Sequence, residues 1–444
     1  MRKTLAPILA LILALILAVR TAHPQGADHG GGHAGDAIRC TSGKPEIAVV
    51  ACTNIIQDKR EDDGKRAIAL RNRAYRYQQL GDFDHAIADY TAALGRPEQH
   101  GLEAKTYLNR GSMYFLRGDE DAALADYDKA GSLDPTLVST YINRATIYIR
   151  RGEDDRALAE LDRAALLNAL DSALFVSRGT LYSRRGDQAR AIADFTTAIK
   201  MDPANAAAWR NRGFAYRALG DKAAAAADAA EAIRLNPNLA AAHRDLGLSA
   251  EGPDRAARAL AEFDQAIRLN PQDAQAFKAR GDVYLANGNW DLAIADFSSA
   301  IALDPKSYAA YLNRGQAFGA KREPGRAIAD FTAALGLKAD AVEAYRRRAF
   351  FRQEDGDGQG ALEDYDRAIA LDPVDAEALR GRGHLWLMRH DAEAAITDLT
   401  AAIALNPQDA LAYQFRGAAY AAKRDFRRAN LDAAAASHID PSAR

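Results

Sequence analysis

The apolar residues of this chain recur with a helical spacing, and that pattern is itself repeated every 34 residues. In most units, large apolar or aromatic side chains stand at positions four and eleven, and in all of them a small residue stands at position eight. This is the i, i+4, i+7 stripe of one helix face. A second stripe follows, with alanine at positions twenty and twenty-seven in all eleven units. Each unit therefore predicts two antiparallel helices, and the chain is expected to be all-α.

The small residue at position eight marks the repeat along the sequence. It recurs every 34 residues after a first step of 37, at Ala74, Gly111, Ala145, Gly179, Gly213, Gly247, Gly281, Gly315, Ala349, Gly383 and Gly417. The repeats start at residues 67, 104, 138, 172, 206, 240, 274, 308, 342, 376 and 410, and together they fill residues 67–443. A unit of this size cannot bury a core alone, so the units are expected to stack as a solenoid that presents its function on a long surface.

Glycine at position fifteen in seven units and proline at position thirty-two in eight predict the ends of the two helices. Together with the aromatic ring at position twenty-four, the residues at these positions resemble the signature of the tetratricopeptide repeat (TPR) family. The particular residue pattern of this chain is similar to that of exported bacterial members. The resemblance implies a right-handed superhelical solenoid of about eleven helix-turn-helix repeats. It also implies a concave groove, lined by the first helices, that binds peptides, helices or domains of partner proteins.

Two charged positions depart from a purely apolar interior. Position seven is arginine in ten of the eleven repeats, and position twenty-three is acidic in all of them. We expect a ladder of arginine–carboxylate pairs, one per repeat, that fixes helix register; the sequence leaves open whether each pair lies within a repeat or between neighbours. The alternative, a charged track for a ligand, is disfavoured because opposite charges at contacting positions cancel.

The resemblance places positions two, five, six, nine, twelve and thirteen on the groove, and we call these positions the groove face. Position six is asparagine in five repeats, and a carboxamide can pair with a peptide backbone as both donor and acceptor. Cations at position five make the central and C-terminal groove more basic than the N-terminal groove. The predicted partner-binding residues, with the asparagines expected to be exposed, are Asn72, Asn109, Asn143, Arg210, Asn211, Arg244, Lys278, Asn313, Arg346 and Arg347. The alternative is that these are solvated polar residues without a partner.

The first residues belong to a different regime. A basic start is followed by the apolar run Leu5–Val19, which has the length of a secretory signal segment and is short for a membrane span. We expect a signal peptide over residues 1–22; left uncleaved, it would anchor the chain to the inner membrane. Residues 23–39 are expected to form a flexible His/Gly-rich leader. Its histidines could bind a metal loosely, but a soluble spacer is favoured because nothing rigid holds the ligands.

Cys40 and Cys52 are the only cysteines, and in an exported chain they are expected to form a disulfide. Aligning Gly43 with position fifteen places Ala48, Cys52 and Ile55 at positions twenty, twenty-four and twenty-seven. Residues 40–66 are therefore expected to hold a lone second helix that caps the first repeat.

Repeats five and six carry the weakest version of the pattern. Ala229 replaces the ring of repeat five, and in repeat six Leu246 replaces the arginine and Gly252-Pro253 interrupts the first helix. Local stability in a solenoid is a sum of repeat and neighbour terms, so we expect the stack to be weakest here and to allow a hinge.

Composition and motifs exclude several functions. With 58 basic and 60 acidic residues, no net charge steers the chain toward nucleic acid. We find no catalytic, phosphate-binding or metal motif, and we expect no enzyme activity and no cofactor. The sequence favours a protein–protein interaction scaffold of the bacterial envelope, periplasmic or secreted, with a partner peptide or domain in the groove. The alternative is an envelope assembly factor for polysaccharide or secretion machinery. A polysaccharide would require a contiguous aromatic platform, whereas the inward rings Tyr75, Phe115, Phe214, Phe350 and Phe415 are scattered.

Overall fold

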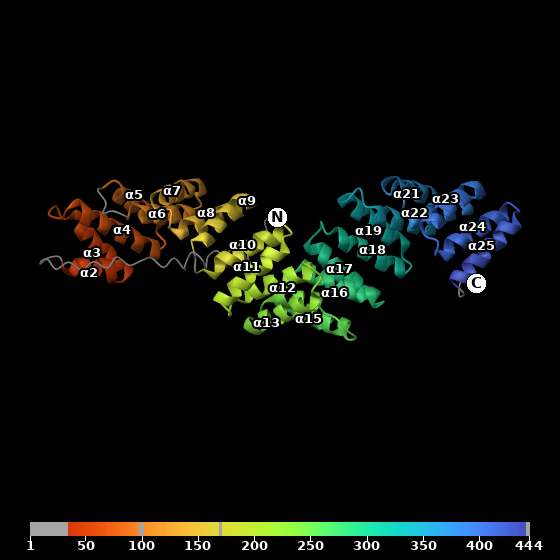
Figure 1. Cartoon of the computed structure of the whole chain (residues 1–444), viewed down its shortest axis with the longest axis horizontal. Helices are drawn as coiled ribbons and strands as arrows, with labels where there is room; N and C mark the ends of the chain where they lie inside the picture. Colours follow the sequence, from red (N-terminus) through yellow and green to blue (C-terminus); the bar gives the residue numbers. More distant parts are fainter. Residues whose placement is uncertain (1–33, 97–101, 168–170, 441–444) are drawn as a thin grey trace. The chain divides into compact units, whose positions relative to one another are not determined.

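The computed structural model describes residues 34–96, 102–167 and 171–440. Over these ranges the chain forms 24 α-helices and no strand (Figure 1). The predicted signal peptide and the first part of the leader lie outside the described residues. Among the described helices, none combines the length and apolar character needed to cross a membrane.

The chain divides into two compact units between Asp221 and Lys222, and the boundary falls in the turn of repeat five. The N-unit contains α2 Ala34–Ser42, α3 Pro45–Gln57, α4 Asp63–Gln79, α5 Phe83–Leu94, α6 Glu103–Arg117, α7 Glu120–Leu133, α8 Val138–Arg151, α9 Asp154–Leu166, α10 Ser172–Arg184, α11 Gln188–Met201 and α12 Ala206–Ala218. The C-unit contains α13 Lys222–Leu235, α14 Ala240–Leu248, α15 Arg255–Leu269, α16 Ala274–Ala286, α17 Trp290–Leu303, α18 Tyr308–Ala320, α19 Pro324–Leu337, α20 Val342–Glu354, α21 Gly358–Leu371, α22 Ala376–Met388, α23 Ala392–Leu405, α24 Ala410–Ala422 and α25 Phe426–Ile439.

Within each unit, consecutive helices pack pairwise, and from α6 onward the first helix of each repeat starts within one residue of the position where the sequence starts that repeat. The second helices often begin with aspartate at position sixteen, as in α11, where Asp187 accepts a hydrogen bond from the backbone N–H of Arg190. Such a cap satisfies one of the free amides at the helix start. The prediction of an all-α helical solenoid is confirmed.

In ten of the eleven repeats, the turn between the two helices has a left-handed residue at position fifteen. The seven glycines predicted there all have positive φ. Four repeats lack that glycine. In three of them Arg322, His390 and Arg424 hold the same conformation, with φ of 61°, 63° and 64°, whereas in repeat six position fifteen is Asp254, with φ of −95°. The backbone geometry of the turn is therefore kept even where the side chain opposes it.

The core of a repeat is built from the small residues and the single ring. The alanines at position twenty-seven are buried in every repeat. The ring at position twenty-four lies against position eight: a Cβ added to Gly281 would stand 2.8 Å from Phe297. The close approach of the two helices explains why position eight is glycine or alanine throughout.

The N-terminal cap differs from the expectation of a lone helix. The disulfide between Cys40 and Cys52 is confirmed, and Ala48, Cys52 and Ile55 are buried as predicted. However, residues 34–39, which the sequence assigned to the flexible leader, begin helix α2. The disulfide ties α2 to α3, and Arg76 of repeat one donates a hydrogen bond to the Thr41 carbonyl. These two ties order a segment whose own composition is polar, so the cap is a pair of helices.

Repeat six is shortened where the sequence is interrupted. Its first helix, α14, has 9 residues, whereas the first helices of its neighbours α12 and α16 have 13. Gly252, with φ of 86°, takes the left-handed role four residues after α14 ends. In repeat five, Ala229 is buried at the ring position and supplies only a methyl group.

Candidate binding surface

The predicted ladder is present, and each described pair lies within one repeat. Eight arginines donate Nε and Nη2 to both oxygens of the aspartate sixteen residues later, at 2.7 to 2.8 Å. The bidentate pairs are Arg73–Asp89, Arg110–Asp126, Arg178–Asp194, Arg280–Asp296, Arg314–Asp330, Arg348–Asp364, Arg382–Asp398 and Arg416–Asp432. In repeat three, Arg144 makes a single bond of 2.6 Å to Glu160.

The same arginines also tie each repeat to the one before it. Nη1 of each donates to a hydroxyl or carboxylate of the preceding second helix, at 2.6 to 3.2 Å. The guanidinium lies over the rings of positions four and eleven, as Arg314 does over Tyr311 and Phe318. The hydrogen bonds of Asp194 raise the pKa of Arg178, so the cation is permanent. The charged groups of the ladder are thus paired with one another within and between repeats, so their role is structural.

Repeat six replaces this rung with a histidine. Where Leu246 stands in place of the arginine, His243 at position four places its Nδ1 2.7 Å from the Glu262 carboxylate. Its Nε2 lies 3.1 Å from the carbonyl oxygen of Pro237. The acidic residue of the ladder thus keeps a partner from a different position of the first helix.

The position-five cations do not form the basic track that the sequence predicts. Arg244, Arg346 and Arg380 each pair with the aspartate 29 residues later, which caps the first helix of the next repeat. For Arg380, the distance from Nη1 to Asp409 Oδ2 is 2.7 Å, while the same carboxylate accepts the backbone N–H of Ala412. Lys278 pairs with Asp282 and Arg347 with Glu343. Each of these C-unit cations has an acidic neighbour, which offsets the positive charge expected there.

The position-six asparagines lie between repeats and are half-buried, whereas the sequence places them in the open. Asn313 donates to Asp282 of the preceding repeat at 2.7 Å. Asn143 faces the buried hydroxyl of Tyr127, and Asn109 faces that of Tyr90. The Tyr90 hydroxyl makes no hydrogen bond of standard geometry with the described residues, and burial raises its pKa. Asn109, Asn143 and Asn313 therefore each contact a residue of the preceding repeat and remain partly exposed at a groove-face position.

Asn72, Arg210 and Asn211 complete the predicted set, and all three are half-buried. The guanidinium of Arg210 donates to the Asn211 side-chain oxygen at 3.4 Å, so these two neighbours engage each other. The predicted residues thus recur along the groove face of both units, and the structure does not gather them into one site.

Sequence reasoning missed an apolar patch on the groove face of repeats nine to eleven. Phe350, Met388 and Leu411 stand at positions nine, thirteen and two, and their exposed fractions are 48%, 56% and 45%. Beside them, the rings of His384 and Phe415 stack with centroids 4.1 Å apart. The signal is present in the sequence, since these are groove positions of consecutive repeats, but it appears only when methionine, leucine and histidine are considered together with the aromatic residues.

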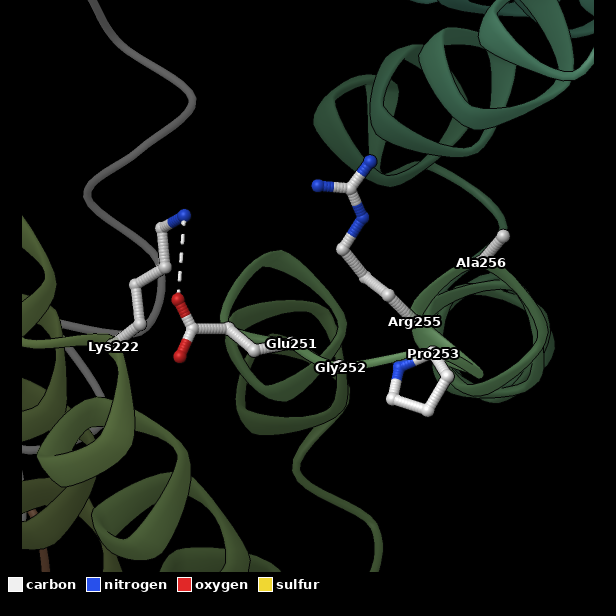
Figure 2. Close-up of a pocket in the computed structure, with 6 residues that line it drawn as sticks. All are labelled: Lys222, Glu251, Gly252, Pro253, Arg255 and Ala256. Carbon is white, nitrogen blue, oxygen red and sulfur yellow. Dashed lines mark ion pairs between the residues drawn. The ribbon is translucent and has the colours of Figure 1, made fainter.

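A shallow pocket of about 350 Å³ lies at the interrupted turn of repeat six. Figure 2 shows Lys222 and Glu251 facing each other across it, and their ion pair is 3.6 Å long. Gly252, Pro253 and the start of α15 line the rest. The pocket is open and its one acid is opposite a lysine, so the arrangement offers no reactive group. Among the described residues, no group of three or more His, Cys, Asp or Glu side chains is placed to hold a metal ion.

Comparison with known proteins identifies the repeat. A tetratricopeptide repeat model matches residues 71–136, 176–240, 244–308, 278–342 and 352–410. No curated protein sequence matches the chain. The solved structures to which the chain is similar include the three that follow, and their TM-scores below 0.5 give no basis for a functional argument. PilW, described as a widely conserved type IV pilus biogenesis factor, is 22% identical with a TM-score of 0.43, and the match covers 47% of this chain and 96% of PilW. For pilF of Pseudomonas aeruginosa the identity is 19% and the TM-score 0.44, with 48% of this chain and 97% of pilF covered. For yeast Tom70 the identity is 17% and the TM-score 0.36, with 85% of this chain and 93% of Tom70 covered. The family model matches more than half of the residues, and the chain is therefore a member of the tetratricopeptide repeat family.

Proposed function

We propose that this chain is a non-enzymatic scaffold that binds a peptide or domain of a partner protein along its groove face. The observation that carries the proposal is how the charges are used. The ladder arginines and the position-five cations of the C-unit contact acidic neighbours or adjoining repeats, and amides and apolar side chains remain to face a partner. Amides that present both a donor and an acceptor suit the backbone of a protein ligand.

The proposed location is the bacterial envelope, periplasmic or secreted. Two features support it: the apolar run Leu5–Val19 behind a basic start, and the disulfide between Cys40 and Cys52. Disulfides persist in exported proteins and are rare where thiols are kept reduced. Mass spectrometry of the native protein should find a chain that begins after Ala22 and retains the bonded cysteines. An intact N-terminus with two free thiols would contradict the assignment.

A triple variant tests the groove face. Replacing Asn109, Asn143 and Asn211 together by alanine should weaken partner binding by about 0.5 to 1.5 kcal/mol for each residue, the usual net value of a hydrogen bond. The partner is first captured from an envelope extract with the wild-type chain, and its affinity is then measured for both forms. Because these amides are half-buried, circular dichroism and thermal melting of the variant must accompany the binding data. A large loss of stability with unaltered affinity would show that the asparagines are structural only.

A further inference from the structure

We propose that the groove face of repeats nine to eleven docks an apolar peptide segment that carries no net charge. This inference rests on the proposed function and deepens it by naming the kind of ligand and the part of the chain that takes it. The docking patch consists of Phe350, Gln353, His384, Met388, Leu411 and Phe415, all within the C-unit.

The first support is the concentration of exposed apolar side chains. Four large apolar residues of the C-unit are exposed on groove-face positions among the described residues. Three of them, Phe350, Met388 and Leu411, come from three consecutive repeats, while Leu248 stands apart in repeat six. Exposed apolar side chains that cluster mark interaction sites more often than single ones do.

The second support is that polar contacts connect these side chains across the repeats. Gln353 of α20 donates its Nε2 toward His384 Nδ1 at 3.0 Å and toward Met388 Sδ at 3.2 Å, both on α22. His384 in turn stacks on Phe415 of α24. A ring nitrogen that accepts from an amide belongs to a neutral imidazole, which keeps the stack uncharged. These contacts connect Gln353, Met388, His384 and Phe415 across repeats nine to eleven. Phe350 lies three residues before Gln353 on α20 and Leu411 four residues before Phe415 on α24, which places each on the same helix face as the connected residue.

The third support is the charge balance, which selects the occupant. The charged groove-face residues of repeats nine to eleven are three acids and three arginines: Glu343, Glu354, Glu377, Arg346, Arg347 and Arg380. Arg347 pairs with Glu343, Arg346 with Asp375 and Glu377, and Arg380 with Asp409. Only the exposed Glu354 has no ion pair among the described residues. A strongly charged ligand would have to compete with the existing pairs, whereas an uncharged one leaves them intact. The ligand that gains most here buries leucine, phenylalanine or methionine side chains against the patch.

Gln353 provides a way to orient such a ligand. Its amide nitrogen is engaged by His384 and Met388, but its carbonyl oxygen accepts no hydrogen bond from the described residues. That oxygen is available to a backbone N–H of the bound segment. The apolar contacts would supply affinity, and this acceptor would fix the ligand backbone.

A peptide library panned on the purified full chain tests the proposal. Enriched 12-residue peptides are synthesised, and their dissociation constants are measured by fluorescence anisotropy. The enriched sequences should be apolar and carry no net charge. The double variant Met388→Ser/Leu411→Ser should weaken their binding at least about tenfold. The matched control is Phe426→Ser/Leu431→Ser, which removes two side chains that are 63% and 62% exposed on α25, away from the groove face, and should change binding less than about twofold.

The outcomes separate this inference from the proposed function. Enriched peptides that are charged, or that bind the Met388/Leu411 variant as tightly as the wild type, would overturn the docking site. If those peptides instead lose affinity for the Asn109/Asn143/Asn211 variant, the groove scaffold stands and only the apolar patch is rejected. A library in which no peptide is enriched would overturn both. Circular dichroism of each variant confirms that the fold is retained.

Discussion

Removing one arginine of the ladder should cost far more stability than its place near the surface indicates. The perturbation is Arg314→Ala in the C-unit. Arg314 donates two hydrogen bonds of 2.8 Å to Asp330 and one of 3.0 Å to Ser298 of the preceding repeat. The Asp330 side chain is only 7% exposed, so without Arg314 its charge is left buried and uncompensated.

The magnitude follows from that buried carboxylate. Breaking a buried pair by removing one partner costs about 3 to 5 kcal/mol. The Arg314 side chain is 20% exposed, which lets some water reach the aspartate and places the expected loss near the lower end, at about 3 kcal/mol. The double variant Arg314→Leu/Asp330→Leu should recover most of it, because a hydrophobic replacement of similar volume removes the stranded charge.

Urea unfolding followed by circular dichroism measures the loss, and hydrogen exchange locates it. Exchange should rise in α18 and α19 and also in α17, since Ser298 loses its bond to Arg314. The control is Arg234→Ala, whose pair with Glu231 is exposed and should be dispensable. A loss below about 1 kcal/mol for Arg314→Ala, or a double variant no more stable than the single one, would refute the interpretation of the ladder.

Three further outcomes are expected. Replacing Arg424 or His390 by glycine should stabilise the chain by about 1 kcal/mol, because each of these residues holds a left-handed backbone. Conversely, Gly356→Ala, at φ of 89°, should destabilise it. Thermal melting measures both effects, and unchanged melting temperatures would contradict the prediction. Cys40→Ser/Cys52→Ser should lower the stability of the N-terminal cap by about 3 kcal/mol and expose α2 to proteolysis first, and equal resistance would contradict this. Burial lowers the pKa of His384, so the unfolded chain binds more protons than the folded one, and stability should fall as the pH drops through the unfolded pKa near 6.5. The residues in contact with His384, Gln353 and Phe415, do not titrate, and Arg380 on the same helix is paired with Asp409. The variant His384→Gln should therefore remove that part of the pH dependence of stability.

The helices and the ladder were predictable because their causes are local and repeated. The buried stripe, the left-handed turn and the cap all lie within one unit, so eleven copies report the same geometry. The arginine and the acid recur 16 residues apart, which predicts their contact, although the third bond to the preceding repeat was not foreseen.

The groove face was predicted less well because its side chains make their contacts with residues of neighbouring repeats. Arg380 looks solvent-facing within its own repeat, but its partner Asp409 caps the helix of the next one. The asparagines likewise lie against residues of the repeat before them, as Asn313 does against Asp282. In α2, order comes from a disulfide and from Arg76, whereas the local composition reads as flexible. The residue pattern within a single repeat does not reveal the contacts that its side chains make with the repeats before and after it.

Site-specific photo-crosslinking in the native cell tests the central claim most directly. A photoreactive residue is placed on the groove face at Asn109 or Met388, and on the exposed side of the second helices at Ala193 or Ala295. A scaffold that holds its partner on the groove face should yield a protein adduct from the first pair of positions and little from the second. Adducts from Ala193 and Ala295 without any from Asn109 and Met388 would contradict the account.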